Sequence, residues 1–168
     1  VVIGSGETAV TLVPALAETA AHVTMLQRSP SYIVALPAED PVARVLRRLP
    51  ARLAYAVLRW KNVLLTLLSF QLSRRRPELV KTLIRKGVER RLPAGYPIDT
   101  HFKPPYNPWD QRMCLVPDAD LFEAISAGRA SVVTDRIATL TEDGIELESG
   151  DRLEADLIVT ATGLNLHP

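Results

Sequence analysis

The first residues of the chain combine a short apolar run with a glycine-rich turn. Val1-Val2-Ile3 is typical of a buried strand, and it leads into a turn and then an Ala/Leu/Val-rich helical pattern that extends to Ala21. In such a turn the first glycine permits a tight bend, and the second lets backbone N–H groups approach a pyrophosphate at the positive end of the helix. The spacing predicts a dinucleotide site, although small residues also occur at strand-to-helix turns that bind no ligand. The residues of the turn are Gly4, Ser5, Gly6, Glu7, Thr8 and Ala9.

The end of the next predicted strand, residues 22–27, indicates which dinucleotide is bound. A site for NAD usually has Asp or Glu here, which accepts hydrogen bonds from the ribose 2′-hydroxyl and repels a 2′-phosphate. This chain has Gln27, Arg28 and Ser29 instead. An amide, a guanidinium and a hydroxyl suit a dianionic phosphate, because arginine offers a planar fork of donors and a permanent charge. The pattern favours NADP(H); in the alternative interpretation Arg28 is a solvated loop residue.

The composition is that of one ordinary globular domain. The chain has 168 residues, of which 47% are hydrophobic, and this suffices for a packed core. The single cysteine, Cys114, excludes an internal disulfide framework and suits a reducing cytoplasm. The three histidines are isolated from other ligand residues, so we expect no metal site. Because the chain begins inside a motif and without Met, we expect it to be a fragment or an excised domain.

The charge is distributed unevenly along the chain. Residues 41–92 contain 14 of the 20 Lys and Arg but only two of the 19 acidic residues. This basic segment has three interpretations: a solvated face, a docking surface for the acidic remainder or for a missing domain, or a patch for anionic lipid. We favour docking, with lipid contact as the alternative, and we expect no nucleic-acid binding because a recognisable module is lacking. Arg59, Lys61 and Arg74 bracket the apolar run too closely for a membrane span, so none is predicted.

The order of the predicted elements describes a discontinuous α/β domain. Residues 1–38 and 118–168 are expected to form a Rossmann-like parallel sheet with a β-hairpin around Asp143-Gly144 and a closing buried strand at 156–160. Residues 39–117 are expected to be an insertion that consists of basic helices and then a Pro-rich loop at 93–117. Within the insertion we predict helices at 42–49, at 53–72 and from Pro77 onward.

Four separated segments of the sequence carry a common signal. The first segment is the glycine turn. The other three are Leu26-Gln27-Arg28-Ser29-Pro30-Ser31-Tyr32, His101-Phe102-Lys103-Pro104-Pro105-Tyr106-Asn107-Pro108-Trp109-Asp110-Gln111-Arg112 with Pro117-Asp118-Ala119-Asp120-Leu121-Phe122, and Asp156-Leu157-Ile158-Val159-Thr160-Ala161-Thr162-Gly163. Together these segments resemble one family, the flavoprotein monooxygenases with two dinucleotide-binding domains, and in particular the Baeyer-Villiger type. The resemblance covers nearly the whole chain and is greatest to the actinobacterial ethionamide-activating group.

The resemblance also implies roles for particular residues. Arg112 matches the active-site arginine that lies beside the flavin and stabilises negative charge during oxygen transfer; from its surroundings alone it could equally be a loop anchor. Its predecessor in relatives is often a lysine that helps to hold the 2′-phosphate, but here it is Gln111, which puts that contact in doubt and leaves Arg28 and Ser29 as the main candidates. Thr162 and Gly163 belong to the segment that returns toward the flavin domain.

The resemblance implies an enzyme that uses NADPH, FAD and O2 to insert oxygen into a ketone or to oxidise a sulfur or nitrogen centre. The remaining glycines form no second dinucleotide fingerprint, so the FAD-binding domain is expected to be absent from this chain, which alone should neither bind FAD nor catalyse the reaction. We expect a cytoplasmic location, with association of the basic helices with a membrane as a further option. The alternative is a stand-alone NADP-binding or membrane-surface module without catalysis.

Overall fold

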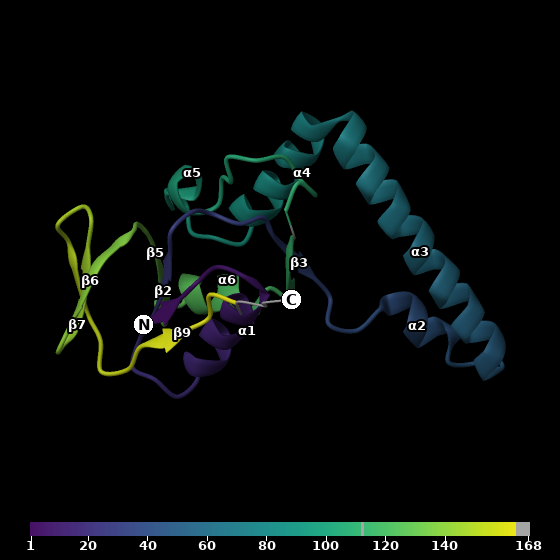
Figure 1. The fold of residues 1–168 in the computed structure, drawn as a ribbon. Helices are drawn as coiled ribbons and strands as arrows, with labels where there is room; N and C mark the ends of the chain where they lie inside the picture. The colour runs from purple at the N-terminus through teal and green to yellow at the C-terminus, as the bar shows by residue number, and fades with distance from the viewer. Residues whose placement is uncertain (112, 164–168) are drawn as a thin grey trace, which may run out of the picture.

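The computed structural model describes residues 1–111 and 113–163, and its centre is a four-stranded parallel sheet. The strands are β1 (Val2–Ile3), β2 (Val23–Gln27), β5 (Ala130–Thr134) and β9 (Val159–Thr160), in the order β5-β2-β1-β9. Because every pair is parallel, the carboxyl ends of all four strands meet at one edge of the sheet (Figure 1). The predicted α/β fold with a parallel sheet is confirmed.

Two helices pack together beside this sheet, α1 (Glu7–Leu16) and α6 (Asp120–Ser126) (Figure 1). Their apolar faces form the main core together with the inner faces of β1, β2 and β5. The first helix is shorter than the sequence pattern suggests. It ends at Leu16, whose carbonyl accepts hydrogen bonds from the backbone N–H groups of Thr19 and Ala20 in the following turn.

A second, two-stranded parallel sheet pairs β3 (Ile33–Leu36) with β4 (Cys114–Pro117). The loop predicted at 93–117 was therefore wrong in part, because this segment also contains the short helix α5 (Ile98–His101). A strand of four residues is stabilised by its distant partner rather than by a local pattern, so the pairing could not be read from the Pro-rich sequence around it.

The predicted hairpin is present and carries a third strand. β6 (Ile137–Thr141), β7 (Gly144–Leu147) and β8 (Arg152–Glu154) form an antiparallel sheet that lies beyond β5 (Figure 1). Ile145 and Leu147 are buried in a small core with Leu26 of β2. The hairpin sheet is therefore packed against the parallel sheet at the end of β2.

The prediction of a buried closing strand at 156–160 was wrong in its extent and its burial. The strand consists of Val159–Thr160 alone, and the side chain of Leu157 is 64% exposed. The physical reason is its position: β9 is at the edge of the sheet and pairs with β1 alone, so one side of the strand has no neighbouring strand.

The basic segment forms three helices, α2 (Pro41–Leu46), α3 (Ala51–Arg75) and α4 (Pro77–Glu89). The helix α3 has 25 residues and extends away from the sheet, with α2 at one end and α4 at the other (Figure 1). By length and composition it is sufficient to cross a membrane, and none of its apolar window is buried, which is weak support for a span. The prediction of no span rested on the charged residues Arg59, Lys61 and Arg74. All three lie within α3.

Candidate nucleotide site at the carboxyl edge of the sheet

Gly4 ends β1 in a conformation that other residues rarely adopt. Its φ angle is +133°, and a Cβ atom added here would lie 2.4 Å from the carbonyl oxygen of Ala161. The backbone N–H of Ala161 donates to the carbonyl of Ile3 at 2.8 Å, which draws the end of β9 against the turn. Gly4 therefore permits the close approach that brings Thr162 and Gly163 to the same cavity as the glycine turn.

Gly6 has a different role, because the space beside it is open. It is the residue before α1, it provides no side-chain cap for the helix, and an added Cβ would meet no atom of the described residues within 4 Å. Behind it, Ala9 is fully buried where the first turn of α1 packs on the sheet. The turn thus leaves room at the positive end of a helix, where a phosphate is favoured.

The serine of the turn joins it to the loop after β2. Ser5 Oγ lies 3.0 Å from Ser31 Oγ, and it donates to the carbonyl oxygen of Ser29 at 3.3 Å. Cys114 Sγ approaches the carbonyl of Ser5 at 3.5 Å. These contacts fix the glycine turn relative to the Arg28-Ser29 loop, so the two predicted parts of the site are held together by the protein itself.

One cavity of about 960 Å³ collects most of the predicted nucleotide-binding residues. Arg28 and Ser29, both exposed, follow β2, and Thr162 and Gly163 follow β9; the glycine turn, which follows β1, lies between them in the strand order. Ala9, which lies beneath the turn, is not part of the lining. The lining residues are Ile3, Gly4, Ser5, Gly6, Glu7, Thr8, Leu26, Arg28, Ser29, Asp135, Arg136, Ile137, Glu148, Ala161, Thr162 and Gly163.

Gln27 does not belong to this cavity, contrary to the expectation that its amide faces the nucleotide. Its side chain is 1% exposed, and Nε2 donates to the carbonyl of His101 and to Thr134 Oγ1, both at 2.8 Å. Because neighbouring residues of a strand point to opposite faces, Gln27 points into the protein while Arg28 reaches the edge. The amide therefore anchors the α5 segment to β5 and does not contact the ribose.

Four residues that the sequence pattern did not indicate also line the cavity. Asp135, Arg136 and Ile137 follow β5, which pairs with β2 and ends at the same edge, and Glu148 follows β7. A hydrogen bond from Ser149 and another from the backbone N–H of Arg136 lower the pKa of Asp135 below its ordinary value. The strand order, which places the end of β5 beside the end of β2, is the information that locates this wall.

Two other predicted residues stand apart from the cavity as described. Gln111 is exposed and pairs in an isolated bridge with Pro108, outside the lining of the cavity. Arg112, the predicted catalytic arginine, lies outside the described residues. The loop before it is held by α3: the rings of Phe70 and Trp109 meet edge to face at 5.8 Å, and Arg74 Nη1 donates to Asp110 Oδ1 at 2.8 Å.

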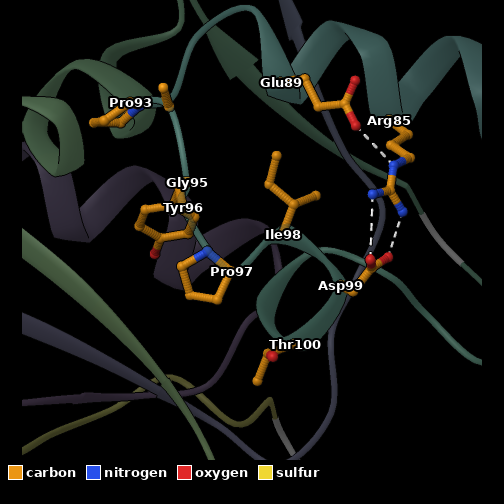
Figure 2. Close-up of a pocket in the computed structure, with 10 residues that line it drawn as sticks. Arg85, Glu89, Pro93, Gly95, Tyr96, Pro97, Ile98, Asp99 and Thr100 are labelled. Carbon is orange, nitrogen blue, oxygen red and sulfur yellow. Dashed lines mark hydrogen bonds and ion pairs between the residues drawn. The ribbon is translucent and has the colours of Figure 1, made fainter.

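A second hollow, of about 360 Å³, lies between α4 and α5 and has a structural explanation. Figure 2 shows Arg85 between two carboxylates, with Nε donating to Glu89 at 2.7 Å and the guanidinium also bound to Asp99. The hydrogen bond from Arg85 lowers the pKa of Asp99. The cation is thus occupied in attaching α4 to α5, and this hollow is a weaker candidate for an anionic ligand than the cavity at the sheet edge.

The comparisons with known proteins agree with this geometry. No protein-family model matches the chain. The structure is similar to "OTEMO complex with FAD and NADP" (TM-score 0.70, 17% identity, 98% of this chain and 37% of that one) and to "Oxidized steroid monooxygenase bound to NADP" (TM-score 0.70, 19% identity, 96% and 38%). The fold is therefore that of part of a flavoprotein monooxygenase.

Relatives found by sequence are much more similar to this chain than these structures are. The chain is 54% identical to the FAD-containing monooxygenase EthA of Mycolicibacterium smegmatis, 55% identical to EthA of Mycobacterium tuberculosis, and 49% identical to the probable FAD-binding monooxygenase AlmA of Acinetobacter baylyi. Each match covers 99% of this chain but only 34–35% of the relative. The chain is homologous to about one third of the length of these FAD-containing monooxygenases, which confirms the resemblance inferred from the sequence.

Proposed function

We propose that this chain is the NADPH-binding part of an FAD-dependent monooxygenase. The observation that supports this most directly is a single cavity, at the carboxyl edge of a parallel sheet, that contains both the glycine turn and Arg28. In open α/β sheets dinucleotides bind at this edge. The homologues are named as FAD-containing monooxygenases, and related structures contain NADP.

The residues of the cavity fit NADP(H) by chemistry and by available space. The open side of Gly6 would admit the pyrophosphate, and the hydroxyl of Thr8 lies in the same lining. Arg28 and Ser29 would hold the 2′-phosphate, because a guanidinium forms charge-assisted hydrogen bonds with phosphate oxygens. Thr162 and Gly163 would face the nicotinamide half, since they follow β9 on the opposite side of the turn.

The residues of this chain would contribute to the reaction by positioning the nucleotide and by placing positive charge beside it. When bound, NADPH supplies a hydride for the FAD that the rest of the protein would hold, and the cofactors carry the redox chemistry. The glycine turn and Arg28 would fix the nucleotide, and Arg112 would stabilise negative charge beside the flavin, where a fixed cation acts more strongly than it does in water. The missing FAD-binding domain is thus the first partner that we propose.

The proposed reaction inserts one atom of O2 into a ketone or oxidises a sulfur or nitrogen centre. The test uses the full-length protein with FAD, NADPH, isotopically labelled oxygen, and a ketone and a sulfide as probes. We expect one labelled oxygen atom in at least one product, measured by mass spectrometry. Tight NADPH binding without a labelled product from either probe would favour the alternative, a nucleotide-binding module without catalysis.

We also propose a cytoplasmic location for the nucleotide site. The single cysteine, Cys114, is buried beside the glycine turn, where it approaches Ser5 and would remain a thiol in a reducing compartment. Two separate experiments test this location: fractionation of cells after mild lysis, and protease treatment of intact cells.

Arg136 is expected to assist Arg28 in holding the 2′-phosphate. Both arginines line the cavity, and the backbone of Arg136 is fixed because its carbonyl accepts the N–H of Glu148 at 2.9 Å. The substitution Arg136→Gln should weaken NADPH binding about fivefold to tenfold, which is the effect of one exposed charge-assisted hydrogen bond, and should leave NADH binding nearly unchanged. Calorimetry on the full-length protein measures both affinities.

The matched control is Arg44→Gln, because Arg44 is an exposed arginine that lies outside the cavity and pairs with Glu39. It should leave the affinities for both nucleotides unchanged. Equal losses of NADPH and NADH affinity in Arg136→Gln would show that Arg136 supports the cavity wall and does not contact the phosphate.

A further inference from the structure

The helix α3 carries an apolar stripe that the described residues leave uncovered. Large apolar side chains recur along it at helical spacing, each of them 41–64% exposed: Leu53, Val57, Trp60, Leu64, Leu67 and Leu68. At about 100° per residue these positions fall on one side of the helix. A patch of this kind marks a site of interaction, because water is an unfavourable neighbour for so much contiguous apolar surface.

The opposite side of α3 carries a row of polar residues and the exposed Tyr55, while Val63, Leu65 and Leu72 are exposed between the two sides. Asn62, Thr66, Ser69 and Ser73 follow one another at the same spacing, and Ser73, which is 3% exposed, faces the protein near α4. The hydroxyls of Ser69 and Ser73 donate to backbone carbonyls of their own helix, at 2.8 and 2.7 Å. The apolar stripe therefore points away from the side of the helix that contacts α4.

Cations flank this stripe at both ends. Arg47 and Arg48 lie between α2 and α3, Arg52 lies in the first turn of α3, and Arg75 and Arg76 lie at its end. Among the residues that the structure describes, none of these five arginines forms an ion pair. The surrounding segment 41–92 contains 14 basic residues and two acidic ones. This charge is complementary to an anionic surface, and an apolar stripe between clusters of arginine is typical of helices that lie in a lipid interface.

The geometry favours a helix that lies on the surface over one that spans the bilayer. Between Lys61 and Arg74 the helix has 12 residues without charge, which is about 18 Å of helix. A span requires about 20 apolar residues. We propose that α3 binds an anionic lipid surface, with the stripe Leu53–Leu68 immersed at the boundary between headgroups and acyl chains and the flanking arginines paired with lipid phosphates.

The experiment is co-sedimentation of the full-length protein with lipid vesicles, either of pure phosphatidylcholine or with about one third phosphatidylglycerol. We expect strong binding to the anionic vesicles, weak binding to the neutral ones, and release as the salt concentration rises. The double substitution Leu64→Gln with Leu68→Gln should lower the apparent affinity at least about tenfold, because two apolar side chains lose their immersion.

The control is Leu140→Gln, which changes a leucine of similar exposure, 59%, on the hairpin strand β6 and should leave vesicle binding unchanged. Thermal unfolding shows whether each variant is folded. Hydrogen exchange of α3 in the unsubstituted protein provides a second measurement, and we expect slower exchange of the helix when anionic vesicles are added than in the protein without lipid.

Three results would overturn the proposal: absence of binding to anionic vesicles, equal binding by the double variant, or no slowing of exchange in α3 when anionic vesicles are added. Unchanged exchange would show that the stripe is covered by the rest of the full-length protein or by a second copy. Sedimentation velocity of the double variant separates these two occupants, because only the second predicts the loss of an oligomer.

Discussion

Replacement of Arg28 by alanine is expected to abolish most of the preference of the full-length protein for NADPH over NADH. Arg28 lies at the end of β2 and lines the cavity that contains the glycine turn. Loss of a charge-assisted hydrogen bond to a phosphate should cost on the order of 1–3 kcal/mol, or about fivefold to 150-fold in NADPH affinity. The affinity for NADH, which lacks that phosphate, should change less than about twofold. Calorimetric titration with both nucleotides measures the change.

Arg28→Lys is the informative companion to this variant. It retains the charge but lacks the planar fork of donors, so its NADPH affinity should fall between those of the unsubstituted protein and Arg28→Ala. If the unsubstituted protein binds NADPH and NADH equally, the assignment of the 2′-phosphate site to this loop is incorrect.

Replacement of Arg112 by alanine should separate NADPH oxidation from product formation. The role of Arg112 comes from the family resemblance, in which it stabilises negative charge beside the flavin during oxygen transfer. Flavin reduction by NADPH should remain within about tenfold of its original rate, a change of roughly 1.4 kcal/mol in the barrier. Oxygenated product should nearly vanish, and the reducing equivalents should appear as hydrogen peroxide.

Stopped-flow absorbance at the flavin band and a peroxide assay measure the two halves of this prediction independently. Gln111→Ala is the matched control, because Gln111 is the exposed neighbour of Arg112 and lies outside the cavity lining. It should keep the ratio of product to NADPH consumed. An Arg112→Ala enzyme that oxygenates a ketone or sulfide near the original rate would show that Arg112 is a loop anchor.

The parts of the fold that could be predicted are those with a local signal. The glycine turn, the strand at Ala130–Thr134 and the hairpin around Gly144 each combine a residue pattern with a turn that requires glycine. The pairing of β3 with β4 has no such signal, because the two strands are far apart in the sequence and both are short.

The residues of the candidate site also could be predicted only where a local signal exists. Arg28 could be identified because it directly follows a predicted strand. Arg136 could not be identified without the strand order, since its position depends on the pairing of β5 with β2. Gln27 was assigned to the nucleotide because sequence position does not show which face of the strand is buried, and the structure places it in the interior.

The loop before Arg112 is attached to α3 and also, through Tyr106, to Tyr32, whose hydroxyl donates to the carbonyl of Tyr106 at 2.7 Å. Trp109 and Asp110 are held by Phe70 and Arg74, which lie near the end of a straight helix of 25 residues. Because Phe70 and Arg74 belong to this helix, a contact that tilts α3 would also displace Trp109 and Asp110. The position of the loop is thus coupled to a helix whose other end extends away from the sheet (Figure 1).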